Sequence, residues 1–218
     1  NQKLTILFLS CDKYSDLWEP LFYCIKKFWP GCQYRLVLGS ITKVYKNKSI
    51  ETILSGPDSD WSTSLQKILT HITTQYVFLW LDDSFPIAPV DSKAFSKTLE
   101  FMMRQKAKCV HASPSPKPDK VFNNGEFGEY FSGAPFRVVS QAFWEVKYLS
   151  RLILQGENAW NFEILCSYRS MYSDGFYCSM KPVVRYINVV EKGKIFKDSY
   201  DICKSLEIPL KTSNREII

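Results

Sequence analysis

The chain has 218 residues, enough for the core of one domain, and its 45% hydrophobic and 23% charged residues exclude a disordered chain. The formal net charge of +6 is spread along the sequence, and no stretch resembles a nucleic-acid-binding module. The charge therefore favours an anionic ligand or an acidic membrane surface over nucleic acid. The sequence contains no apolar run of membrane-spanning length and no signal-peptide pattern, which predicts a soluble, cytoplasmic protein.

The seven cysteines are odd in number, and no two of them are spaced as C-x-x-C. Several lie within apolar runs. This pattern disfavours a zinc site or a disulfide framework and predicts reduced, mostly buried thiols.

The N-terminal segment predicts a strand, a helix and a second strand. Residues 3–10 are almost entirely apolar and lead into Ser10-Cys11-Asp12. Helical spacing of apolar residues follows from about Trp18 to Pro30-Gly31, and residues 33–39 form the next apolar run. This order predicts a right-handed βαβ unit in a parallel sheet. Ser10 and Asp12 would lie at the sheet edge, where Asp12 could accept hydrogen bonds from a nucleobase or ribose, or simply cap the turn.

A short strand is predicted near residues 50–54, before an amphipathic helix over residues 61–72. The acidic residues Asp58 and Asp60 precede this helix. Ser62 and Ser64 lie in its first turn, where they could contact a phosphate or sugar because helix N-termini attract anions. Ordinary capping of the helix is the alternative interpretation.

The strongest strand signal is the apolar run that begins at Tyr76 and ends in two adjacent carboxylates, Asp82 and Asp83. An unbroken apolar run of this length is typical of a strand buried on both faces of a sheet. Both carboxylates would then lie at the C-terminal edge, where open α/β sheets bind ligands. They could hold a divalent cation, which in turn could hold a diphosphate. Alternatively, they could only end the strand and cap a turn.

The second half of the chain has no internal repeat and continues to alternate between helix and strand patterns. Its long segment 113–133 is rich in Pro, Gly and Asn, which is typical of a functional loop. The remaining predictions are, in order, a helix over 92–106, a strand over 107–112, a short strand over 136–139, a helix over 141–154, a helix from 163 through 172, a strand over 181–190, a basic turn over 191–194 and a polar tail to 218.

Three segments, in this order, resemble the small bacterial glycosyltransferases of the GT-A fold that build lipopolysaccharide O-antigen or capsule. They are residues 10–14 with 16–20 and 28–30, the Trp-Leu-Asp-Asp of residues 80–83, and residues 156–163 with 190–194 after them. Together they span most of the chain. The acidic motif departs from the family pattern, because the family has Asp-any-Asp and here the two aspartates are adjacent.

The resemblance implies a single GT-A domain, an α/β fold with a mostly parallel sheet between helices. Residues 1–112 would form the nucleotide-sugar half, and residues 113–218 the acceptor-binding and catalytic half of the same domain. The implied donor is a nucleotide-diphosphate sugar, with a UDP-sugar favoured. The implied acceptor is a glycan or lipid-linked molecule, and the expected location is the cytoplasm with at most peripheral association at the inner membrane.

Two alternatives remain for neutralising the diphosphate. Asp83 is the expected direct ligand of Mg²⁺ or Mn²⁺, with Asp82 nearer the ribose. In a mechanism without metal, Lys192 and Lys194 on the glycine-containing turn could close over the phosphates instead, or they could form a solvated hairpin tip.

Sugar transfer also needs a base for the acceptor hydroxyl. The resemblance places that base near the start of a helix, which selects Glu163, with Glu157 in reserve, and implies inversion by a single displacement. Trp160 could stack on the acceptor sugar and His111, at a strand end, could line its pocket, although both could equally belong to the core.

Two other functions remain open. A nucleotidyltransferase would also use acidic strand ends, but it normally has a glycine-rich basic loop after the first strand, and Ser10-Cys11-Asp12-Lys13 contains no glycine. The second alternative is a nucleotide- or carbohydrate-binding module without catalytic activity.

Overall fold

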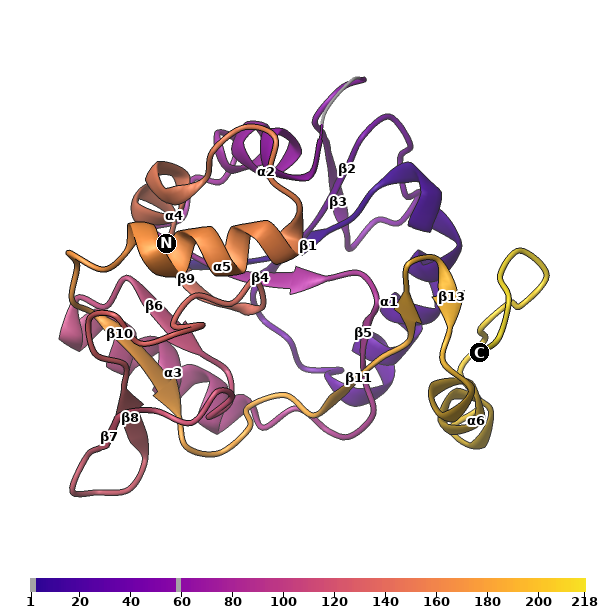
Figure 1. Ribbon diagram of the computed structural model, residues 1–218. Helices are drawn as coiled ribbons and strands as arrows, with labels where there is room; N and C mark the ends of the chain where they lie inside the picture. Colours follow the sequence, from indigo (N-terminus) through magenta and orange to yellow (C-terminus); the bar gives the residue numbers. More distant parts are fainter. Residues whose placement is uncertain (1–2, 58–59) are drawn as a thin grey trace.

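The computed structural model describes residues 3–57 and 60–218 and has a mixed sheet at its centre (Figure 1). In this part of the chain, nine strands are ordered β3-β2-β1-β4-β9-β6-β10-β8-β7. Their bounds are β1 (Leu4–Leu9), β2 (Arg35–Ser40), β3 (Glu51–Leu54), β4 (Tyr76–Leu81), β6 (Cys109–His111), β7 (Lys120–Val121), β8 (Phe127–Glu129), β9 (Ala142–Glu145) and β10 (Phe176–Ser179).

The predicted βαβ unit is confirmed. β1 pairs in parallel with β2 on one side and with β4 on the other, and β2 pairs in parallel with β3. Every residue of β1 is buried, as an apolar strand between two parallel neighbours requires. β9 runs antiparallel to both β4 and β6, and β10 is parallel to β6. The expected α/β class with a mostly parallel sheet is therefore confirmed.

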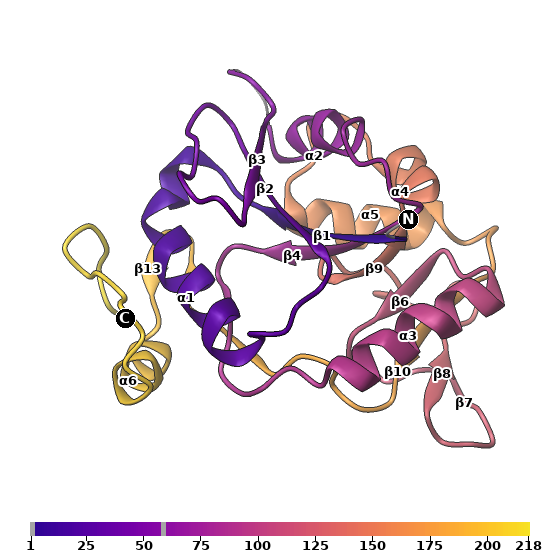
Figure 2. The same cartoon turned by 180° about the vertical axis from the view of Figure 1, so that it is seen from behind.

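Helices cover both faces of the sheet (Figures 1 and 2). One face packs against α1 (Trp18–Phe28) and α3 (Ser92–Gln105), and the other packs against α2 (Trp61–Leu69), α4 (Val146–Leu152) and α5 (Ala159–Arg169). Alternation along β1 divides its side chains between the two layers, with Ile6 and Phe8 in the first and Leu7 and Leu9 in the second.

Smaller elements complete the rim of the sheet. The 3₁₀ helix η1 (Asp12–Leu17) joins β1 to α1. β5 (Ser84–Pro86) pairs with β11 (Tyr186–Asn188), and β12 (Val190–Glu191) forms a hairpin with β13 (Lys194–Ile195). The predicted polar tail contains a helix, α6 (Lys197–Ser205), and its last residues return to pair beside Ile195. Asp58 lies outside the described residues.

Three predictions in the second half are wrong. The helix expected over 141–154 begins only at Val146, because Ala142, Phe143 and Trp144 are fully buried as β9 between β4 and β6. Residues 136–139 form no strand. The single strand expected over 181–190 does not form. The strand that joins the main sheet is β10, which ends before this range, and the range itself contains only β11 and the start of β12, which lie outside the main sheet.

Both halves of the chain share this one sheet. β9 and β10, from the second half, flank β6, from the first half. The division of labour between residues 1–112 and 113–218 stays a prediction. None of the helices within the described ranges is long and apolar enough to cross a membrane.

Phe143→Ala is expected to lower the free energy of unfolding by about 3–5 kcal/mol. The Phe143 ring is fully buried and lies 4.6 Å from the ring centroids of both Phe78 and Phe95, so its removal leaves a cavity at the junction of three elements. Urea unfolding measures the loss. Phe131→Ala, at a half-exposed ring, is the control and should change stability by less than about 0.5 kcal/mol. Equal losses in the two variants would contradict the packing described for β9.

Candidate active site

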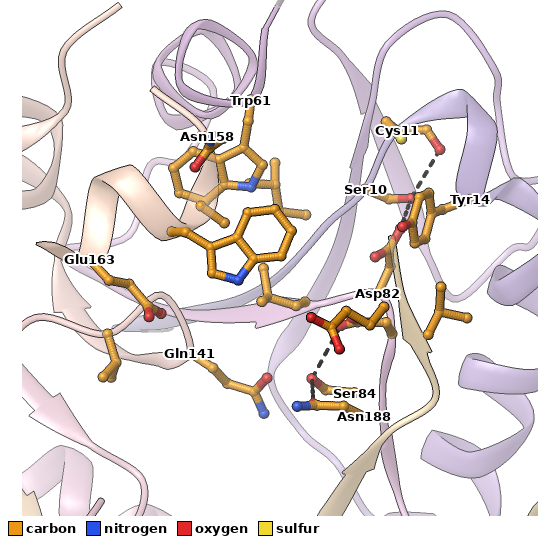
Figure 3. A pocket seen from close by; sticks show the side chains of 18 of the residues that line it. Ser10, Cys11, Tyr14, Trp61, Asp82, Ser84, Gln141, Asn158, Glu163 and Asn188 are labelled. Carbon is orange, nitrogen blue, oxygen red and sulfur yellow. Dashed lines mark hydrogen bonds between the residues drawn. The ribbon is translucent and has the colours of Figure 1, made fainter. Parts of the chain in front are cut away.

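A cavity of about 970 Å³ opens at the C-terminal edge of β1 and β4 (Figure 3). This is the edge where parallel α/β sheets bind ligands. Side chains from distant parts of the sequence line it. Among them are Ser10, Cys11, Asp12 and Tyr14 after β1, Asp82, Asp83 and Ser84 after β4, His111 at the end of β6, Gln141 before β9, Trp160 and Glu163 on α5, Tyr186 and Asn188 on β11, and Lys192 in the β12–β13 turn.

Ser10 and Asp82 join the ends of the two central strands. The Ser10 hydroxyl donates to the Asp82 carboxylate and accepts a hydrogen bond of 2.7 Å from Trp18 Nε1. Burial raises the pKa of Asp82 well above its usual value, although the Ser10 hydrogen bond opposes the shift. No salt bridge in the described part of the chain reaches Asp82. The two residues form a buried acidic wall of the cavity.

Asp83 lies beside this wall and is held by the β5–β11 ribbon. Its carbonyl accepts from the Val189 amide at 2.8 Å, and the Ser84 hydroxyl lies 3.4 Å from Asp83 Oδ1 and 3.1 Å from Asn188 Oδ1. Burial raises the pKa of Asp83 to about 6. Ser84 and Asn188 are register partners, so the ribbon gathers oxygen atoms at one place.

Oxygen ligands of this kind suit Mg²⁺ or Mn²⁺. Among the described residues, however, no three His, Cys, Asp or Glu side chains gather closely enough to hold a metal ion. The residues present therefore fit a cation that takes most of its ligands from water and a bound diphosphate, and they do not form a closed metal cage. In such a site Asp83, with the Asn188 side-chain oxygen nearby, would supply the protein's share.

Asp12 lines the cavity, but its carboxylate is hydrogen-bonded to the loop that follows β2. Its carboxylate accepts from the Thr42 amide at 3.0 Å, the Thr42 hydroxyl and the Lys43 amide at 3.0 Å. Burial raises the pKa of Asp12, but these hydrogen bonds outweigh it and the net shift is downward. Asp12 therefore ties the loop after β2 to the end of β1, a contact with a distant loop that differs from the cap on the following turn considered from sequence.

The N-terminus of α2 already carries an anion. Asp60 is its N-cap and accepts from the Thr63 amide at 2.7 Å, the Ser62 hydroxyl at 2.7 Å and the Gly156 amide at 3.2 Å. Ser62 is fully buried in this cap and does not line the cavity. Ser64 does line it, with its hydroxyl 3.0 Å from that of Ser55. The geometry thus gives Ser62 a capping role and provides no access for the phosphate predicted there.

The two candidate bases have different surroundings. Glu163 accepts from the Ser140 amide at 2.7 Å, and its carboxylate points into the cavity across from Asp82 (Figure 3). Glu157 lies outside the cavity, buried, where it forms a 2.8 Å ion pair with Arg169 and accepts from the Leu154 amide at 3.1 Å. Glu157 therefore fixes the turn before α5, and Glu163 is the carboxylate that a substrate could reach.

The two predicted acceptor residues also differ. Trp160, 59% exposed, lies at the rim of the cavity. His111 is buried in the cavity wall, with Nε2 3.0 Å from the Arg137 carbonyl and its ring 4.5 Å from that of Tyr130. Burial lowers the pKa of His111 to about 4, so this imidazole is neutral at neutral pH. His111 is thus part of the packed wall.

The predicted basic turn is a two-residue hairpin. Lys192 (φ 48°) and Gly193 (φ 85°) both adopt the left-handed conformation that such a turn requires. Lys192 lines the cavity, whereas Lys194 lies outside it in an exposed 2.8 Å ion pair with Glu216. Arg215 holds the turn from behind, with hydrogen bonds of 2.7 Å to the Asp16 carboxylate and 3.2 Å to the Gly193 carbonyl.

Sequence reasoning missed several lining residues, of which Gln141 is the most informative. Both polar atoms of its amide are buried and have no hydrogen-bond partner among the described residues. Figure 3 shows this amide pointing into the cavity between Glu163 and Asn188. No local signal identifies Gln141. The alternation of Tyr186 and Asn188 along a predicted strand could have placed these two on one face.

No family model and no curated protein matches the sequence. Solved structures do share the fold. The bifunctional IspDF from Campylobacter jejuni aligns with a TM-score of 0.51 and 16% identity over 86% of this chain and 52% of its own. TarS from S. aureus aligns with a TM-score of 0.51 and 10% identity over 96% of this chain and 41% of its own. Its 1–349 fragment aligns with a TM-score of 0.52 and 9% identity over 85% of this chain and 59% of its own.

The chain thus spans about half the length of these proteins. At such low identity the likeness concerns the fold alone. The arrangement of sheet and helices described above is the one that this chain shares with TarS and IspDF.

Proposed function

We propose that the chain is a glycosyltransferase that moves a sugar from a nucleotide-diphosphate donor, preferably a UDP-sugar, to a glycan or lipid-linked acceptor in bacterial surface polysaccharide synthesis. One observation carries the proposal. The acidic strand end at Asp82 and Asp83 and the carboxylate of Glu163 face each other across one cavity. Two structures of the same fold, TarS, a glycosyltransferase, and IspDF, a nucleotidyltransferase, support a transferase with a nucleotide-activated substrate.

The donor would bind along the ends of β1 and β4. Its diphosphate would lie beside Asp83, where a Mg²⁺ or Mn²⁺ ion would neutralise part of its charge. Lys192 approaches the same cavity from the hairpin turn and would supply a second positive charge. Asp82, buried and bonded to Ser10, would lie nearer the ribose.

The acceptor would enter from the side of α5. Its hydroxyl would give its proton to Glu163 while its oxygen forms a bond to the anomeric carbon. The bond from that carbon to the diphosphate oxygen would break at the same time, and its electron pair would leave with the diphosphate. Attack from the Glu163 side, opposite the diphosphate, inverts the anomeric configuration. Trp160 at the rim would stack on the acceptor sugar.

Gln141 would bind the transferred sugar. Its amide offers one acceptor and two donors between Glu163 and the Asp83 side of the cavity, and these atoms lack protein partners in the described chain. Sugar hydroxyl groups are the natural complement of such a group, since an unpaired buried amide costs about 1–3 kcal/mol.

Gln141→Leu is therefore expected to lower kcat/KM for the sugar donor by about 10- to 100-fold and to leave the affinity for the free nucleotide unchanged. Steady-state kinetics with the donor and calorimetry with the nucleotide separate the two effects. Gln105→Leu, at an exposed position at the end of α3, is the control. An equal loss of nucleotide affinity would place Gln141 at the nucleotide and contradict its assignment to the sugar.

Product analysis tests the proposed activity against its alternatives. The chain is incubated with UDP- and GDP-sugars, Mn²⁺ and a panel of glycan and lipid-linked acceptors, and release of the nucleoside diphosphate is followed. Turnover of one donor supports the proposal. Release of pyrophosphate from a nucleoside triphosphate would instead identify a nucleotidyltransferase, which the glycine-free segment after β1 disfavours. Nucleotide binding without any turnover would identify an inactive binding module.

A further inference from the structure

The helix α5 is apolar on its outer side as well as its inner side. Its inner residues Phe162 and Cys166 are fully buried in the core. Its exposed residues are Trp160, Asn161, Ile164, Leu165 and Tyr168, which occupy an arc of about 140° at 100° per residue. Asn161 is the one polar residue among these five. A helix at the surface of a globular domain normally turns charged and polar residues outward.

The apolar surface continues beyond the end of the helix. Met171 follows, and then Tyr172, whose side chain is 99% exposed. The neighbouring loop is held against this end by a hydrogen bond from the Ser132 hydroxyl to the Met171 carbonyl, and it carries the half-exposed ring of Phe131. We define the α5 face as the exposed side chains of Trp160, Ile164, Leu165, Tyr168, Met171 and Tyr172. Contiguous exposed apolar surface of this kind marks an interaction site.

Along the chain, the exposed charges of residues 146–172 have one sign, while the exposed carboxylates of Asp60 and Asp119 lie near the two ends of the face, where they accept from the Gly156 and Phe131 amides. Between residues 146 and 172 the carboxylates are Glu157 and Glu163, and both turn inward, to Arg169 and to the cavity. The exposed charges in this stretch are Lys147 and Arg151 on α4. The C-terminal end of α4 lies against α5, since Arg169 Nε donates to the Leu152 carbonyl at 2.9 Å. Along the chain after Tyr172, the first exposed carboxylate is Asp174.

We propose that the α5 face docks on a membrane surface that contains anionic lipids. Trp160 lies at one end and Tyr168 and Tyr172 toward the other, with the aliphatic Ile164 and Leu165 between them, which is the composition of a helix lying in the plane of the membrane interface. Lys147 and Arg151 complement anionic headgroups, each contributing about 1 kcal/mol near such a surface. The net charge of +6 acts in the same direction.

The α5 face is continuous with the active-site cavity. Trp160 belongs to the face and also lines the cavity rim, and Glu163 lies on the same helix. Membrane docking through α5 would therefore place the cavity mouth at the lipid headgroups. The sugar of a lipid-linked acceptor would reach Glu163 while its lipid stays in the bilayer, a conclusion that rests on the proposed function, whereas the docking itself does not.

Vesicle sedimentation tests the docking surface. The chain is mixed with vesicles of phosphatidylcholine alone or of phosphatidylcholine with phosphatidylglycerol. Stronger binding to the anionic vesicles is expected. The double variant Ile164→Asp/Tyr168→Asp should bind them at least about tenfold more weakly, because both side chains are exposed and the new charges meet the interface. Tyr23→Asp/Val121→Asp is the matched control, since it adds the same charge at exposed apolar positions of α1 and β7.

Loss of vesicle binding in the α5 variant alone, with circular dichroism and nucleotide affinity unchanged, supports the proposal. Absence of vesicle binding by the unmodified chain, or equal losses in the two variants, would overturn it. So would a dimer in light scattering that the α5 variant converts to a monomer, because the face would then bind a second copy. None of these readouts requires glycosyl transfer, so failure of the proposed function would be recognised separately.

Discussion

Glu163→Gln is expected to lower kcat for sugar transfer by about 10²- to 10⁴-fold. The amide cannot take the proton of the acceptor hydroxyl, yet it has the size of the carboxylate and can still accept the 2.7 Å hydrogen bond from the Ser140 amide. The substitution therefore removes the base and retains the local structure. Single-turnover kinetics with a saturating donor measure the chemical step directly.

Nucleotide binding distinguishes loss of the base from loss of structure. Affinity for the nucleoside diphosphate should be unchanged in Glu163→Gln, because Asp83 and Lys192, on the other side of the cavity, carry the diphosphate in this account. Glu100→Gln, at an exposed position of α3, serves as the control for removal of one negative charge. Full activity of Glu163→Gln would remove Glu163 from the mechanism.

Asp83→Asn is expected to weaken Mn²⁺ binding in the presence of the nucleotide by about 100-fold or more, since an amide lacks the charge of the carboxylate that would supply the protein's share of the proposed site. Electron paramagnetic resonance of free Mn²⁺ measures this without reference to catalysis. Asp198→Asn, at the exposed start of α6, is the control. Unchanged Mn²⁺ affinity in Asp83→Asn would transfer the neutralising role to Lys192.

The same substitution should stabilise the metal-free protein in a pH-dependent way. Burial raises the pKa of Asp83 to about 6, so the folded state binds this proton more tightly than the unfolded state, whose carboxyl pKa is about 3.9. Ionisation of Asp83 therefore costs stability, by an amount that grows from about pH 4 and is complete above about pH 6. Asp83→Asn should raise the melting temperature at about pH 7.5 and much less at about pH 4. A lower melting temperature at the higher pH would contradict the burial of this charge.

Sequence pattern identified the parallel half of the sheet because its strands are continuous apolar runs. β1 is buried from end to end and β4 is buried up to Trp80, and no helical arrangement competes with that pattern. β9 is four residues long and is followed at once by α4, so Phe143, Val146, Leu149 and Ile153 also fit helical spacing. Only the position between β4 and β6, a tertiary contact, makes residues 142–145 a strand.

Because parallel strands end at the same edge of a sheet, the sequence correctly predicted which residues the strands themselves bring together at that edge. Ser10 and Asp82 meet because β1 and β4 are adjacent and parallel. The positions of other predicted site residues depend on ion pairs and strand pairing with distant residues, which no local sequence pattern reveals. Glu157 pairs with Arg169 and Lys194 pairs with Glu216, which keeps both outside the cavity. The oxygen of Asn188 reaches the site only because β11 pairs with β5.

Calorimetric titration of the intact chain with UDP and with GDP, each with and without Mn²⁺, tests most directly the claim that the cavity holds a nucleotide-diphosphate donor. We expect Mn²⁺-dependent binding of one nucleotide, with UDP favoured, and loss of that dependence in Asp83→Asn. Binding that ignores both Mn²⁺ and Asp83 would contradict the metal site and assign the diphosphate to Lys192. Failure of both nucleotides to bind would contradict the donor site itself.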